Sequence, residues 1–85
     1  MSYEHDNSNY DKSEIYSQKI WYSQQIRKIC DRKHVGIAEL SLYSGLSEEY
    51  LQKILAAEVM PSANTLRSIA LALNVSVDLF TKPKY

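Results

Sequence analysis

The 85-residue sequence has few of the residues on which disulfide-rich, metal-binding or nucleotide-binding proteins depend. It contains one cysteine, Cys30, which excludes an internal disulfide and is most simply explained by a cytosolic setting. The two histidines and Cys30 do not have the spacing of a zinc site, and no glycine-rich loop is present to hold a phosphate. The sequence therefore predicts a protein without a metal or a cofactor.

Long apolar runs and a net charge are missing as well. The N-terminus has no apolar run typical of a signal peptide, and no stretch reaches the roughly 20 apolar residues that span a membrane. We therefore expect a soluble, cytoplasmic protein without a membrane partner. Ten basic and ten acidic residues cancel, but residues 1–12 have a net charge of −2 and residues 13–85 a net charge of +2. Attraction of the folded part toward phosphate groups is expected to be weak.

No group of residues predicts catalysis. A nucleophilic Cys30 would need a base and a third, orienting group, and only His34 lies near it in the sequence. A thiol packed in the core is the favoured interpretation, because free cysteines are among the most buried residues. We therefore expect that the protein is not an enzyme.

The apolar residues recur at helical spacing, and no segment alternates as a strand would. Residues 1–12 are polar without a periodic face and predict a flexible tail. The domain is expected to span 13–82, with Ser13 as the first helix cap, and Pro83 is expected to end regular structure before a short terminus, 83–85. The sequence predicts a compact all-α domain of five short helices. They are 13–33 (in one or two pieces), 37–44, 48–56, 62–73 and 77–80.

The stretch ELSLYSGLSEEYLQKIL, residues 39–55, contains the boundary between two of these helices. Gly45 suits the left-handed residue that closes a helix, and Ser47 suits the N-cap of the next. Glu48 and Glu49 fall in the first turn, where the helix dipole favours anions. A helix-turn-helix is therefore expected at about 37–56.

Apolar spacing also predicts the core. The expected inward residues are Ile15, Tyr22, Ile26, Ile29, Cys30, Ile37, Leu40, Tyr43, Leu46, Leu51, Ile54, Leu55, Leu66, Ile69, Ala70 and Leu73, and the last short helix contains Val77, Leu79 and Phe80. Tyr16, Ile20 and Trp21 lie off this stripe, and they pack on the last helix or form a partner surface. The basic residues from Arg27 to His34 are interpreted first as cations that stabilise the end of their own helix.

From about Ile26 to Phe80 the sequence resembles the lambda-repressor/Cro-like helix-turn-helix proteins, also called the xenobiotic-response-element (XRE) family. The resemblance rests on the order and spacing of several short motifs. They are IRKI (26–29), AEL (38–40), SGLS (44–47), LQKI (51–54), PS (61–62), TLRSIALALNVS (65–76) and DLF (78–80).

This resemblance implies a sequence-specific DNA-binding transcription regulator, first of all a repressor, with a phage or prophage type as one option. Helix 48–56 would enter the major groove of a double-stranded operator. Glu48, Glu49, Gln52 and Lys53 would face base edges, and Ser47 and Tyr50 would lie near the DNA backbone. Such proteins usually bind palindromic sites as dimers.

We therefore expect a homodimer, joined by the C-terminal helix around Val77 and Phe80 or by the aromatic segment around Tyr16 and Trp21.

The sequence also departs from the family pattern. Ile37 stands where a phosphate-binding glutamine is common, and Ala57, Glu58 and Val59 replace a glycine followed by basic residues. Cys30 and Leu55 occupy the positions of a common arginine–glutamate pair. These departures leave a second interpretation open, a protein-interaction module on the same fold with a degraded DNA surface.

Overall fold

The computed structural model describes residues 2–81, with side chains from residue 16 onward. Four α-helices follow one another, α1 (Ser2–Lys33), α2 (Ile37–Ser44), α3 (Glu48–Leu55) and α4 (Ala63–Leu73), and a short 3₁₀ helix, η1, covers Val77–Phe80. No strand occurs within residues 2–81, which confirms the all-α prediction. The prediction of five α-helices is corrected, because the last of them is a single 3₁₀ turn. The expected terminus at 83–85 lies outside the described residues.

Helix α1 differs most from the expectation. It begins at Ser2, so the segment expected to be a flexible tail continues the helix, and Ser13 lies inside α1 rather than at its start. The first proline or glycine of the chain is Gly36, and therefore nothing in the preceding residues breaks a helix. The 32 residues of α1 span about 48 Å.

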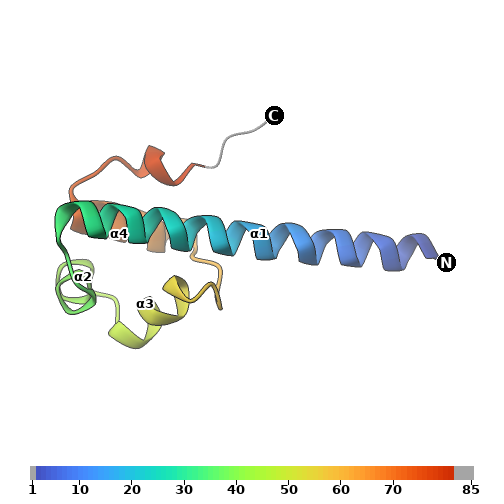
Figure 1. Cartoon of the computed structure of the whole chain (residues 1–85), viewed down its shortest axis with the longest axis horizontal. Coiled ribbons are helices and arrows are strands. Elements are labelled where there is room, and N and C mark those ends of the chain that lie inside the picture. The colour runs from blue at the N-terminus through green and yellow to red at the C-terminus, as the bar shows by residue number, and fades with distance from the viewer. Residues whose placement is uncertain (1, 82–85) are drawn as a thin grey trace.

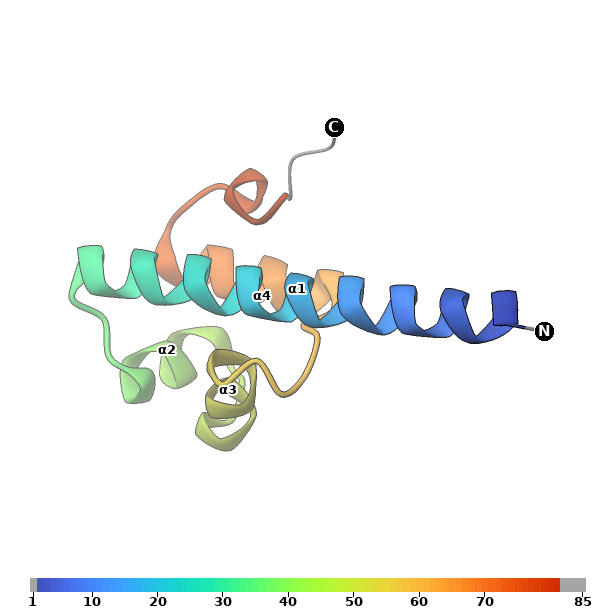
Figure 2. The same cartoon turned by 45° about the vertical axis from the view of Figure 1, so that its right-hand side comes forward.

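The other elements surround the C-terminal part of α1. Figures 1 and 2 show α4 alongside α1, with α2 and α3 on one side of it and η1 returning on the other. Helix α3 contacts both α1 and α2, and α4 contacts α2 and η1. The N-terminal part of α1 projects beyond all of them in both views. The helix-turn-helix unit is thus held by packing on both flanking helices.

Ten apolar side chains form the buried core, and nine of them belong to the predicted set. The ten are Ile26, Ile29, Leu40, Leu51, Ile54, Leu66, Ile69, Ala70, Leu73 and Phe80. The tenth, Phe80, is a residue expected at a dimer interface, and the side chain of Ile15 lies outside the described residues. Tyr22, Cys30, Ile37, Leu46 and Leu55 pack against them and are half-buried. The prediction was wrong for Tyr43, which is 60% exposed. Helix α2 faces inward with Ile37, Leu40, Ser41 and Ser44, and this rotation turns the ring of Tyr43 outward.

Short polar side chains define where the helices begin and end. The Oγ atoms of Ser47 and Ser62 accept hydrogen bonds from the third residue of α3 and of α4, each at 3.1 Å. Gly45 closes α2 with a φ of 78°, and Asn74 closes α4 with a φ of 59°. These caps confirm the predicted boundaries of α2, α3 and α4 to within a residue or two.

Candidate nucleic-acid interface

The turn between α2 and α3 is held by its own side chains. Ser41 Oγ donates to the carbonyl of Leu46, and Leu46 N donates to Ser44 Oγ at 3.2 Å. The side chain of Leu46 is half-buried against the core, as expected for the turn residue. These contacts fix the direction in which α3 leaves the turn, and α3 is the element that would read DNA.

Helix α3 has a buried face and an exposed face. Leu51 and Ile54 are both 1% exposed and anchor it in the core. Glu48, Glu49, Gln52 and Lys53 are all exposed, and their helical spacing places them on the opposite side. The structure thus brings together the four side chains predicted to face base edges. Their contact with bases stays a prediction.

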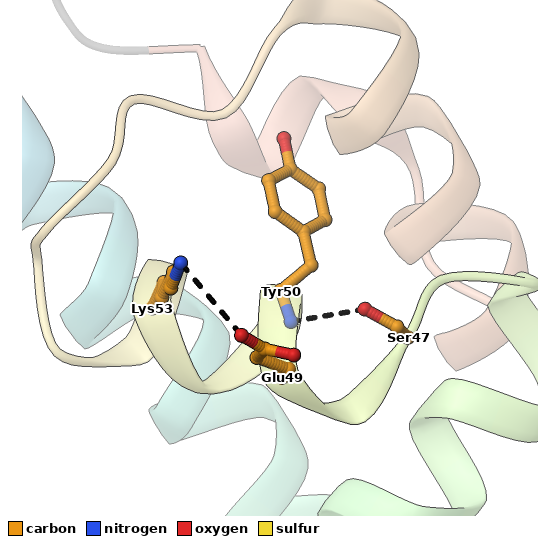
Figure 3. A network of polar contacts seen from close by, with 4 residues as sticks. All are labelled: Ser47, Glu49, Tyr50 and Lys53. Carbon is orange, nitrogen blue, oxygen red and sulfur yellow. Dashed lines mark hydrogen bonds and ion pairs between the residues drawn. The ribbon is translucent and has the colours of Figure 1, made fainter.

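The exposed face of α3 is acidic overall. Two glutamates and one lysine give it a net charge of −1. Lys53 Nζ lies 3.9 Å from Glu49 Oε2, one helical turn away, as Figure 3 shows. Both side chains are at least half exposed, so the pair contributes little to stability. The ion pair changes the charge that DNA would meet, because Lys53 screens Glu49 from an approaching phosphate.

Ser47 and Tyr50, expected near the DNA backbone, have roles within the domain. Tyr50 N donates to Ser47 Oγ, and the Tyr50 ring points away from α3 toward α4 (Figure 3). There the Tyr50 hydroxyl lies 3.2 Å from Thr65 Oγ1. Nothing in the local sequence pattern indicated Thr65, because the two residues are 15 positions apart. Phosphate contact by Ser47 or Tyr50 stays a prediction.

Two cations of α1 bind backbone carbonyls at the C-terminal end of α3 and in the loop that follows it. Arg27 Nη2 donates to the carbonyl of Leu55 at 3.2 Å, and Lys19 Nζ donates to the carbonyl of Glu58 at 3.5 Å. Arg27 therefore serves a neighbouring helix rather than its own C-terminus. Arg32 and Lys33 do lie in the last turn of α1, where their charges favour its dipole.

Most of the residues that depart from the family pattern pack against the core. Ile37 and Val59 are half-buried against the core, whereas Glu58 is exposed. Cys30 and Leu55 are also packed against the core, so replacing a charged pair by apolar residues leaves no unpaired charge there. Ala57 adopts a left-handed φ of 61° immediately after α3, a conformation that glycine adopts without strain.

The segments expected to form a dimer are only partly exposed. Val77 and Leu79 of η1 are 41% and 42% exposed, but Phe80 is buried in the core of its own chain. In α1, Tyr16 is exposed, whereas Trp21 is half-buried and packs edge-on against Tyr22 with ring centroids 5.2 Å apart. Phe80 is thus unable to contact a partner without leaving the core.

Cys30 is the one cysteine of the chain, and it is half-buried. Burial, and then the charge of Asp31, raise the pKa of the Cys30 thiol above its ordinary value, which makes it a poorer nucleophile at neutral pH. Among the side chains from residue 16 to 81, no three His, Cys, Asp or Glu residues lie close enough together to hold a metal ion. Within the described part of the chain, no helix is both long and apolar enough to cross a membrane.

Comparison with known proteins agrees with this architecture. The family model described as "Helix-turn-helix" matches residues 26–80, which is more than half of the chain. Among solved structures, the restriction-modification controller protein C.AhdI from Aeromonas hydrophila superimposes with a TM-score of 0.72. The two sequences are 19% identical, and the match covers 75% of this chain and 97% of that one. No protein with a curated function matches the sequence. The chain belongs to the Cro/C1-type, XRE-like helix-turn-helix family of DNA-binding transcription regulators.

Proposed function

We propose that the protein represses transcription by placing α3 in the major groove of a specific operator. The observation that carries this proposal is the exposed face of α3. Glu48, Glu49, Gln52 and Lys53 lie there together, while Leu51 and Ile54 anchor the opposite face in the core. An operator within a promoter would be occupied without any catalytic step.

Each of the four side chains has a base that it suits. A glutamine amide pairs with adenine, a lysine ammonium reaches the acceptor atoms of guanine, and a glutamate accepts from the amino group of cytosine. Gln52 and Lys53 are therefore the leading base contacts. Each is worth about 1–3 kcal/mol of discrimination if it is made.

Glu48 and Glu49 act in two directions. At the first turn of α3 they stabilise the helix through its dipole, and near DNA they repel phosphates. The repulsion is offset only where a cytosine amino group lies opposite. The two glutamates would therefore lower affinity for arbitrary DNA and raise the difference between sites.

A homodimer is part of this proposal, because one small unit contacts few phosphates and reads few bases. Val77 and Leu79 on η1, and Tyr16 on α1, are the exposed apolar side chains in the two segments considered. Light scattering at high protein concentration, with and without DNA, tests this part. A monomer in both conditions would remove the palindromic operator from the proposal.

A second candidate function is a protein-interaction module. The net charge of −1 on the α3 face favours it, as do the exposed Leu42 and Tyr43 on α2, which are 76% and 60% exposed. In this case α3 would face a protein, and no binding to DNA would be seen.

Binding to labelled duplex DNA at two salt concentrations separates the two candidates. A DNA-binding regulator releases counterions, so its affinity falls steeply between about 50 and 200 mM salt. A selected operator and a scrambled duplex are compared at each concentration. Equal, flat titrations on both duplexes would contradict the proposal and favour the interaction module.

A further inference from the structure

Tyr50 connects the beginnings of two helices. Its backbone N donates to Ser47 Oγ, the cap of α3, and its hydroxyl lies 3.2 Å from Thr65 Oγ1 in α4. Thr65 is in turn bound to the cap of α4, since its N donates to Ser62 Oγ at 3.1 Å and its Oγ1 lies 3.0 Å from Ser62 Oγ. Tyr50, through one hydrogen bond of its backbone and one of its side chain, therefore connects Ser47 with Thr65 and Ser62.

Each of the three hydroxyl groups, of Tyr50, Ser62 and Thr65, has a hydrogen-bond partner among these residues. Ser62 Oγ has one proton, which it donates to Thr65 Oγ1, while its lone pair accepts from Thr65 N. Thr65 Oγ1 retains a proton and a second lone pair, and the Tyr50 hydroxyl can serve either one. Thr65 is 8% exposed, so water has little access if Tyr50 is lost. If Tyr50 is lost, Thr65 Oγ1 keeps only the hydrogen bond from Ser62 Oγ, so the bond to Tyr50 is lost without replacement by water. The stabilisation by that bond holds the Tyr50 ring against α4.

Thr65 itself has no way to read DNA. It is buried, and its Oγ1 is surrounded by Ser62 and Tyr50. Any effect of Thr65 on DNA binding must therefore pass through another residue. Tyr50 is that residue, because it lies within α3 between the exposed Glu49 and Gln52.

We infer that Thr65 is a positioning residue, which sets the orientation of α3 for DNA recognition through the hydroxyl of Tyr50. This inference rests on the proposed function. It assigns the hydroxyl of Tyr50 to α4 rather than to a DNA phosphate. The N-terminal end of α3, which carries Glu48 and Glu49, is then fixed relative to α4 by one interhelical hydrogen bond.

Three conservative variants test it. Thr65→Val and Tyr50→Phe each remove the interhelical hydrogen bond and keep the shape of the side chain. Thr65→Val also removes the acceptor of Ser62 Oγ within α4, whereas Thr65→Ser keeps the hydroxyl. Ser76→Ala is the control for stability alone, because it removes the cap of η1, whose Oγ accepts from Asp78 N at 3.1 Å. Operator and scrambled DNA are titrated with each folded variant.

Thr65→Val and Tyr50→Phe should each weaken operator binding by about 3- to 10-fold, the size expected for one hydrogen bond. The double variant should bind no more weakly than the weaker single one, because both remove the same contact. Thr65→Ser and Ser76→Ala should stay within about 2-fold of the wild type. A Tyr50→Phe loss that multiplies with the Thr65→Val loss would overturn the inference and assign the hydroxyl to DNA.

A measurement without DNA keeps the inference separate from the proposed function. Backbone amide resonances of Glu48, Glu49 and Gln52 should shift in the same direction in Thr65→Val and in Tyr50→Phe, and should not move in Ser76→Ala. Unchanged resonances in Thr65→Val would overturn the positioning role even if the wild type binds DNA. Shifted resonances in a protein that binds no DNA would instead contradict the proposed function alone.

Discussion

Arg27 Nη2 donates a hydrogen bond to the carbonyl of Leu55 at 3.2 Å, which links α1 to the last residue of α3. The last carbonyls of a helix have no partner within it, and a cation there also favours the dipole. The family resemblance implies an arginine–glutamate pair between these two helices, at positions that are Cys30 and Leu55 here. In this chain Leu55 keeps the connection through its backbone while its side chain packs against the core.

Leu51 should be indispensable for folding. It is 1% exposed, and its change to alanine should lower the free energy of unfolding by about 2–5 kcal/mol. Small domains have a total stability of only about 5–15 kcal/mol, so a large drop of the melting temperature is expected.

Leu42→Ala is the matched control, because Leu42 is 76% exposed on α2. Its change should alter the free energy of unfolding by no more than about 0.5 kcal/mol. Thermal melts of the two variants that coincide would show that α3 does not bury Leu51.

Ala57→Gly should stabilise the protein. Ala57 has a φ of 61°, and Glu58 N donates to the carbonyl of Lys53 at 2.9 Å, so the residue occupies the left-handed position that ends α3. Glycine adopts this conformation without the roughly 1–2 kcal/mol that an L-residue loses there. Part of this gain is offset by the greater freedom of glycine in the unfolded chain. Urea denaturation measures the difference, and a lower midpoint in Ala57→Gly would contradict it.

Replacing glycine by alanine at Gly45 and at Gly36 tests the cost of a left-handed backbone conformation in an L-residue. Gly45 has a φ of 78°, so Gly45→Ala should cost about 1 kcal/mol, although its side chain would enter open space. Gly36 has an extended conformation with a φ of −85° and equally open surroundings. Gly36→Ala should therefore be near neutral, and equal urea midpoints for the two alanine variants would show that backbone strain at Gly45 is absent.

Ionisation of the Cys30 thiol should lower the stability of the protein at alkaline pH. Burial raises the pKa of its thiol in the folded state, so the unfolded chain loses this proton first as the pH rises. The contribution of the protonated thiol to the free energy of unfolding is complete below about pH 8.5, the ordinary pKa of a thiol. It decreases as the pH rises above this value. Urea denaturation at pH 7.5 and 9.5 should show a larger decrease for the wild type than for Cys30→Ala. Equal decreases would contradict the burial of the thiol.

Much of the fold follows from local sequence. Gly45, Ser47 and Asn74 end or begin helices through bonds to residues at most four positions away, and apolar spacing identifies the faces of α3 and α4. The contacts that set the direction of α3 join residues that are far apart in the sequence. Tyr50 meets Thr65 across 15 positions and Arg27 meets Leu55 across 28. Such contacts depend on how the helices pack, and no local pattern indicates them.

The start of α1 and the exposure of Tyr43 show two further limits. A polar composition predicts a tail, but it does not stop a helix in the absence of proline and glycine. Tyr43 follows Leu40 by three residues, which fits an inward stripe. The face of α2 that packs on the core instead contains Leu40 and Ser44, and Tyr43 is exposed. The rotation of α2 depends on how it packs against the core, whereas the start of α1 lies beyond the other elements and follows from the absence of helix-breaking residues.

Removing the positive charge and removing the negative charges on the exposed face of α3 should have opposite effects on DNA binding. Lys53→Ala should weaken binding to a selected operator by about 1–3 kcal/mol if Lys53 contacts a base. Lys28→Ala removes an equal charge from the exposed side of α1 and should leave the preference for the operator unchanged. Glu48→Gln combined with Glu49→Gln should raise affinity for a scrambled duplex more than for the operator.

Fluorescence anisotropy of the wild type, Lys53→Ala and the double glutamate variant, on the operator and on the scrambled duplex, tests the central claim most directly. If α3 reads DNA, the wild type prefers the operator, Lys53→Ala loses affinity for it, and the double variant loses discrimination. If all three proteins give the same flat titrations on both duplexes, α3 does not read DNA.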